Sequence, residues 1–197
     1  AHRNGNSNWT EASQTVTFTI ERGNRNATIS GAGGITTAPA GGNRTGDALA
    51  TTPVVKVYDA YGNVVTNSTA TVTAALVSDA TGATLSGNSV AAESGVASFS
   101  NLTLIGTPGT NYTIRFSSGA LTTATASPLT VVPAAASQML IHAQPIGGNA
   151  TGTALTTQPS VVIRDRFNNV VTTDSTAVVT ASISTGAGGT LSGFKTA

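Results

Sequence analysis

The chain carries the sequence Pro53-Val-Val-Lys-Val-Tyr-Asp-Ala-Tyr-Gly-Asn-Val-Val-Thr66, and its pattern returns as Pro159-Ser-Val-Val-Ile-Arg-Asp-Arg-Phe-Asn-Asn-Val-Val-Thr172. Asp59 and Asp165 hold the same place in the two copies and lie 106 residues apart. The similarity also pairs Gly42-Asn43 with Gly148-Asn149, and Leu85-Ser86-Gly87 with Leu191-Ser192-Gly193. A period of this length corresponds to a whole small domain and not to one solenoid repeat.

Short runs of alternating apolar and polar residues dominate the chain, broken by Gly, Asn and Pro about every ten residues. In the run 71–76, for example, Val72, Ala74 and Leu76 fall on one side, and Thr71 and Thr73 fall on the other. No segment combines sustained helical periodicity with helix caps. The pattern therefore predicts an all-β fold built of tandem antiparallel β-sandwiches.

Comparing the copies divides the chain into three parts. Residues 31–135 form one complete unit, residues 136–197 match only its first half, and residues 1–30 precede both. Residues 133–137, Pro-Ala-Ala-Ala-Ser, are the expected linker, because proline interrupts strand pairing. We expect the N-terminal part to be the tail of a preceding domain or a donated strand.

Composition narrows the classes of function. Only 9% of residues are charged, far below the roughly 25% of an ordinary domain, and the formal net charge is +1. Nothing in this balance suggests binding to nucleic acid or to an anionic membrane surface. The chain has no cysteine and no apolar run long enough for a membrane span.

Asp59-Ala-Tyr-Gly-Asn63 and Asp165-Arg-Phe-Asn-Asn169 connect apolar runs and predict turns. Aspartate accepts backbone N–H groups in Asx turns, and Gly62 and Asn168 are residue types that tolerate a positive φ. The alternative is a calcium loop, in which Asp59, Asn63, Asp165 and Asn169 would supply oxygen ligands. The turn is the preferred interpretation, because each loop offers one carboxylate and one amide. No other cofactor is expected.

The motif Val-x-Val-x-Asp-x-x-Gly-Asn-x-Val of the first copy, followed by Ala-Thr-Val-Thr-Ala, resembles bacterial Ig-like domains of invasin- and intimin-type adhesins and of large repetitive surface proteins. The later segments 95–106 and 111–116 are similar to the second half of such repeats. The resemblance implies Ig-like β-sandwiches, and it places Tyr112 where a tyrosine corner could form. It implies no catalytic residues.

The incomplete second unit admits two explanations. The chain is either a fragment of a longer tandem array, with neighbouring tandem domains as partners, or a subunit that polymerises head to tail with copies of itself. In the second case an alternating N-terminal strand would complete the open unit of the next copy by strand addition. That assembly strand comprises Thr15, Val16, Thr17, Phe18, Thr19 and Ile20.

Candidate sites of other kinds are few. The only histidines are His2 and His142, and no nucleophilic or metal-binding motif accompanies them, so we expect no enzyme activity. Asn-x-Ser/Thr sequons are candidate glycosylation sites in a secreted protein. They lie at Asn8, Asn26, Asn43, Asn67, Asn101, Asn111 and Asn149.

The sequence therefore predicts a structural or adhesive protein of the cell surface, belonging to an extracellular filament, sheath, surface layer or stalk. The alternative is a carbohydrate- or receptor-binding Ig-like module, accessory to a larger secreted protein. Such a module would bind a glycan or a host receptor through exposed aromatic residues. The candidates for that role are Trp9, Tyr58, Tyr61 and Phe167.

Overall fold

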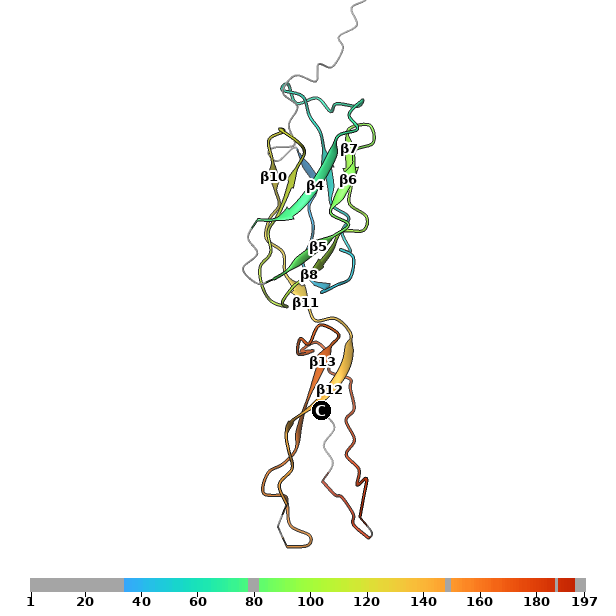
Figure 1. Cartoon of the computed structure of the whole chain (residues 1–197), viewed down its shortest axis with the longest axis vertical. Helices are drawn as coiled ribbons and strands as arrows, with labels where there is room; N and C mark the ends of the chain where they lie inside the picture. Colours follow the sequence, from blue (N-terminus) through green and yellow to red (C-terminus); the bar gives the residue numbers. More distant parts are fainter. Residues whose placement is uncertain (1–33, 78–81, 148–149, 187, 194–197) are drawn as a thin grey trace, which may run out of the picture.

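The computed structural model describes residues 34–77, 82–147, 150–186 and 188–193. These residues form strands, turns and irregular segments, with no helix among them, which confirms the all-β class. It follows that no membrane-spanning helix occurs in the described part of the chain. Figure 1 shows two elongated parts stacked along the long axis, residues 34–132 above and residues 136–193 below.

The upper part contains most of the strands. One sheet has the order β1 (Ile35–Thr37), β3 (Val54–Lys56), β7 (Val96–Ser98), and a second has the order β10 (Ala124–Thr125), β9 (Ile114–Ser117), β4 (Thr71–Leu76), β6 (Ser89–Ala91). Both are antiparallel. Two smaller sheets pair β5 (Thr84–Ser86) with β8 (Thr103–Ile105) and, in parallel, β2 (Asn43–Arg44) with β11 (Val131–Val132).

A continuous hydrophobic core fills the upper part. Val72 and Ala74 of β4 are fully buried and Leu76 is half-buried, so the alternation in this strand was predicted correctly. The ring of Phe99, which follows β7, lies 5.1 Å from the ring of Phe116 in β9, with the ring planes tilted by 58°. This contact joins residues near the three-stranded sheet to the four-stranded sheet.

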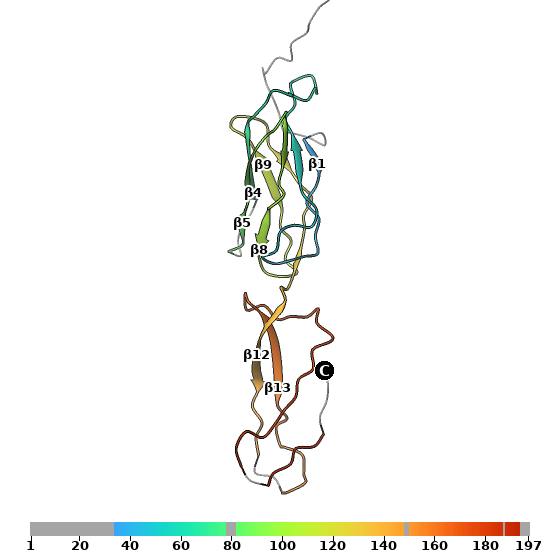
Figure 2. The ribbon, with the colours of Figure 1, turned by 90° about the vertical axis from the view of Figure 1, so that its right-hand side faces the viewer.

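The lower part has one pair of strands, β12 (Ala136–Ala143) and β13 (Ser160–Asp165), which are antiparallel. After Asp165 the described residues form turns and irregular segments without a further strand. Because β12 begins at Ala136, the connection between the parts is shorter than the expected linker 133–137, and Pro133 and Ala134 within it are buried. Figure 2 shows the connection as a narrow neck between the two parts.

Candidate assembly interface

The loop after β13 is built around one carboxylate. The side-chain oxygen Oδ1 of Asp165 accepts the backbone N–H groups of Phe167 and Asn169, each at 2.9 Å. Its second oxygen, Oδ2, accepts the Asn169 side-chain amide at 3.0 Å and the backbone N–H of Ala134 at 2.9 Å. Asn168 has a φ of 69°, as predicted for a left-handed turn residue.

This environment favours the ionised form of Asp165. Burial of the carboxyl raises its pKa, but hydrogen bonds from the Asn169 amide and from the backbone N–H groups of Ala134, Asn169 and Phe167 together lower the pKa below its ordinary value. The carboxylate therefore holds the loop to the chain that enters the same unit at Ala134. Ionisation and loop structure stabilise each other.

The loop after β3 repeats this geometry. Oδ1 of Asp59 accepts the backbone N–H groups of Tyr61 at 2.9 Å and Asn63 at 2.8 Å, and the Asn63 side-chain amide donates to Oδ2 at 3.1 Å. Gly62 has a φ of 82° and so takes the place of Asn168. The structure thus places Asp59 in hydrogen-bond contact with Asn63, and Asp165 in the same contact with Asn169.

These hydrogen bonds are those of the predicted Asx turns. In both loops the Oδ1 atom of the aspartate accepts two backbone N–H groups. Among the residues that the structure describes, no cluster of three or more His, Cys, Asp or Glu side chains is arranged to hold a metal ion.

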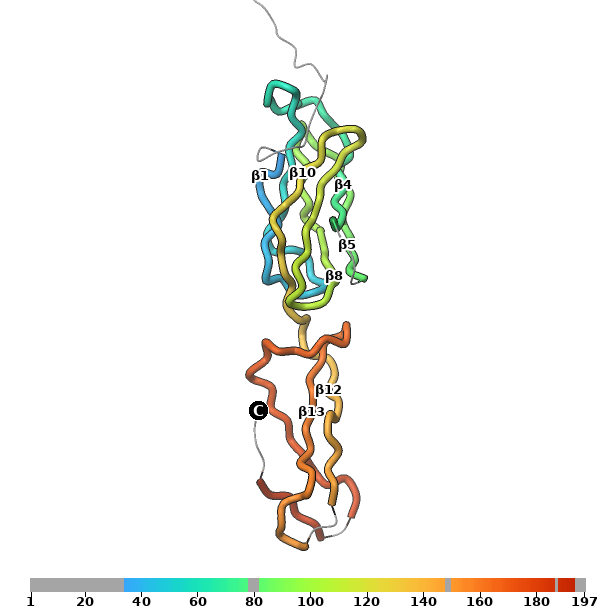
Figure 3. The backbone as a smooth tube through the Cα atoms, turned by 90° about the vertical axis from the view of Figure 1, so that its left-hand side faces the viewer, coloured from blue at the N-terminus to red at the C-terminus, as the bar shows by residue number. Residues whose placement is uncertain are grey.

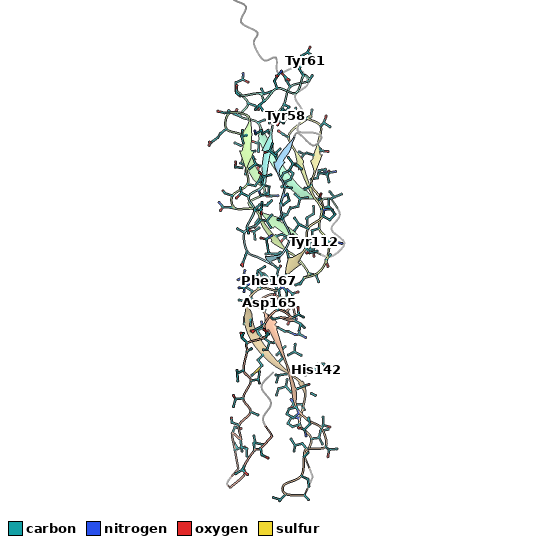
Figure 4. The ribbon with its side chains drawn as sticks, turned by 180° about the vertical axis from the view of Figure 1, so that it is seen from behind. Tyr58, Tyr61, Tyr112, His142, Asp165 and Phe167 are labelled. Carbon is teal, nitrogen blue, oxygen red and sulfur yellow. The ribbon has the colours of Figure 1, made fainter. Side chains whose placement is uncertain are left out.

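The loop after β13 also contacts the upper part of the molecule. The Arg166 guanidinium donates to the carbonyl oxygen of Gly46 at 3.2 Å and forms an ion pair with Asp47 at 3.5 Å. The Phe167 ring packs directly on Gly46, so that any Cβ at this position would collide with the ring. Gly46 has a φ of 81°, which also favours glycine. Figure 4 shows Asp165 and Phe167 at this junction.

A groove lies beside this contact, with a volume of about 450 Å³. Three segments line it: residues 107–109 and 130–133 of the upper part and the neck, and residues 169, 170, 172 and 173 of the lower part. The groove borders the Gly46 contact, the Arg166 hydrogen bond and the Arg166–Asp47 ion pair, which connect the two parts here. We call the contact between the 165–169 loop and the turn 44–47 the unit junction.

The hairpin β12–β13 leaves large apolar side chains in solvent. Met139 is 60% and Ile141 57% exposed, and Leu140, on the opposite face, is also exposed. Among the described residues from 136 to 193, only Asp165 is buried. A two-stranded hairpin without a covered apolar face has little stability of its own.

The open edge of the hairpin is also visible in the pairing. In the upper part β3 has β1 on one side and β7 on the other. Its counterpart β13 pairs with β12 alone among the described strands. Figure 3 shows the red segment after β13, which lies to the left of the hairpin at first and crosses it in this view further down. In the described part of the chain, only the C-terminal end of this edge of β13 is covered, by the bridge between Arg164 and Val170 and the hydrogen bond from the Val171 N–H to the Ile163 carbonyl. A partly open edge beside exposed apolar side chains is a surface suited to strand addition.

Other predicted residues have different surroundings. The assembly strand Thr15–Ile20 lies outside the described residues, as do Trp9 and the sequons at Asn8, Asn26 and Asn149. Asn67, Asn101 and Asn111 are exposed. Asn43 is buried, and its side chain donates to the carbonyl of Ala40 and accepts the N–H of Ala50, so the folded chain does not offer this amide for glycosylation.

Sequence reasoning missed Gly46 and Arg166. Arg166 contacts a residue 120 positions earlier in the chain, so no local pattern signals the contact. One available signal was the repeat itself, which places a glycine at both 46 and 152. No family model, no curated protein and no solved structure matches this chain.

Proposed function

We propose that this protein is a structural, adhesive component of the cell exterior, built of Ig-like β-sandwich units stacked end to end. Two observations support the Ig-like architecture. The ring of Phe99, next to the sheet β1-β3-β7, packs against the ring of Phe116 in the sheet β10-β9-β4-β6. The Tyr112 hydroxyl accepts the N–H of Thr107 at 2.7 Å, five residues upstream, in the manner of a tyrosine corner.

In this proposal, copies of the chain join head to tail. The alternating strand Thr15–Ile20 of one copy completes the open β12–β13 unit of another, and no catalytic step is involved. The observation that carries the proposal is the contrast in burial: the upper part has a closed core, whereas Met139, Leu140 and Ile141 of the lower part face solvent. Because the donating and accepting regions differ, the contact is heterologous, and it extends into a filament when the rotation between copies does not close a ring.

The accessory binding module has weaker support. Of its aromatic candidates within the described residues, Phe167 packs in the unit junction and Tyr58 is half-buried. Only Tyr61 remains fully accessible, and carbohydrate-binding surfaces usually combine several aromatic side chains. Selective binding on a glycan array, lost in Tyr61→Ala, would favour this second function.

Electron microscopy and sedimentation velocity test the filament proposal on the full chain. The wild type should form fibres, and a variant without residues 1–22 should be folded but unassembled. Two variants of full length test whether the apolar side chains of this strand are needed. Val16→Thr/Phe18→Thr/Ile20→Thr removes the apolar face, and the matched control Thr15→Ser/Thr17→Ser/Thr19→Ser changes only the polar face.

The first triple variant should not assemble, and the second should assemble like the wild type. A wild-type chain that stays a monodisperse monomer would contradict the proposal. Fibres formed equally well by the truncated chain would show that the N-terminal strand is not the joining element.

A further inference from the structure

The unit junction within one chain has two halves. One half is the turn 44–47, in which the N–H of Asp47 donates to the carbonyl of Arg44 at 3.1 Å and Gly46 presents a bare backbone surface. The other half is the 165–169 loop, which places the Phe167 ring on that glycine. Each half belongs to a different unit of the chain.

Both halves recur at the repeat spacing, and among the described residues no side chain covers Gly152 and the Tyr61 ring is exposed. In the turn 150–153, the N–H of Thr153 donates to the carbonyl of Ala150, again at 3.1 Å. Gly152 has a φ of 80°, against 81° for Gly46. No atom lies within 4 Å of a Cβ built on Gly152, whereas Phe167 covers Gly46.

The second half recurs as the 59–63 loop. Its backbone has the same Asx-turn hydrogen bonds as the 165–169 loop, and Tyr61 holds the place of Phe167. Tyr61 is 91% exposed. Figure 4 shows it at the end of the molecule opposite the lower part, and Figure 1 shows the connection between β12 and β13, which contains the turn 150–153, near the other end.

The charges of the two copies of the junction differ in a consistent way. Asp47 and Arg166 form the ion pair of the observed junction. Their counterparts are Thr153 and Ala60, so the repeat loses both charges together. A contact between the 59–63 loop and the turn 150–153 leaves no charge unpaired. A contact between the 59–63 loop and the turn 44–47 would leave Asp47 without its arginine.

We propose that Tyr61 of one copy packs on Gly152 of a second copy of this chain and so reproduces the unit junction between molecules. The inference rests on the proposed head-to-tail assembly and names its second contact. In the observed junction the neck at Ala134 runs beside the 165–169 loop and is bonded to Asp165. In the proposed filament, the Tyr61 loop of one copy takes the corresponding place beside the turn 150–153 of the neighbouring copy.

Site-specific cross-linking tests this contact, because the native chain has no cysteine. The variant Ala60→Cys/Thr153→Cys, treated with a short bis-maleimide after assembly, should give a ladder of covalent dimers, trimers and longer oligomers on a denaturing gel. The variant Asp47→Cys/Arg166→Cys is the positive control, which should cross-link within one chain. Ala60→Cys/Thr125→Cys, with the second thiol at the exposed residue of β10, should give no ladder.

Substitution of Tyr61 gives an independent measurement. Tyr61→Ala should raise the critical concentration for assembly about tenfold, because a ring that fills a central contact often contributes this much to association. Tyr61→Phe should assemble like the wild type, since Phe167 performs the same packing in the observed junction. The melting temperature of the unassembled monomer should not change in either variant, because Tyr61 is exposed there.

The possible failures are distinguishable. Fibres that form normally in Tyr61→Ala and give no ladder would overturn the Tyr61–Gly152 contact while leaving the filament proposal intact. Dimers formed by Ala60→Cys alone would indicate a symmetric head-to-head contact and would also overturn it. A wild-type chain that never assembles would overturn both proposals.

Discussion

At the scale of single residues, one aspartate organises each repeat. The carboxylates of Asp59 and Asp165 accept hydrogen bonds from backbone N–H groups of their own loops. The fourth residue of each loop has a positive φ. The sequence predicted the turn at each aspartate and the residue with positive φ within it. Their hydrogen bonds are local, so they depend little on the rest of the fold.

Replacing Asp59 with alanine should destabilise the upper part. The substitution removes the acceptor of the Tyr61 and Asn63 N–H groups, and loss of the partner of a hydrogen-bonded polar group costs about 1–3 kcal/mol. We expect the free energy of unfolding, measured in urea, to fall by about 2 kcal/mol. Asn67→Ala, at an exposed position, is the control and should change it little.

Acid should weaken the 165–169 loop at a low pH. Because the pKa of Asp165 is lower in the folded state, its contribution to stability is complete above the unfolded pKa, about 3.9, and is lost as the pH falls through the folded value. The amide NMR signals of Ala134 and Phe167 should therefore shift with a midpoint below about 3.9. A midpoint above this value, or the same titration in Asp165→Asn, would contradict the assignment.

At the scale of elements, the repeat produces two strand pairs with different surroundings. The strand β4 follows its sequence alternation because one face packs on the core and the other is wetted. In β12 the three consecutive apolar residues Met139, Leu140 and Ile141 are all exposed. Alternation predicts which residues share a face, but it cannot reveal whether another element covers that face.

The unit junction could not be predicted either, since it depends on a contact between residues about 120 positions apart. Gly46→Ala should open it, because the new Cβ would meet the Phe167 ring and a positive φ disfavours alanine. Gly152→Ala is a matched control with the same φ and open space around it. Small-angle scattering of the monomer should show a broader range of shapes for Gly46→Ala alone; identical profiles would contradict the role of Gly46.

At the scale of the whole molecule, the two parts combine a closed core with an open hairpin. The upper part and the unit junction hold the chain in an elongated arrangement, as Figures 1 and 2 show, and the lower part exposes the apolar side chains that a further strand could cover. Sequence comparison of the two copies predicts one complete unit and one incomplete unit. The structure adds the Gly46 contact and, through the repeat, the candidate contact between Tyr61 and Gly152.

Hydrogen exchange of the β12 and β13 amides, compared between the monomer and the assembled protein, tests strand completion most directly. In the monomer, amides of Leu140 and Ile141 should exchange much faster than those of Val72 and Ala74, because the hairpin lacks a buried face. In assemblies the hairpin should become as protected as β4, and the chain without residues 1–22 should never gain that protection. Assemblies in which β12 and β13 continue to exchange at the monomer rate would contradict completion of the lower unit by a second copy.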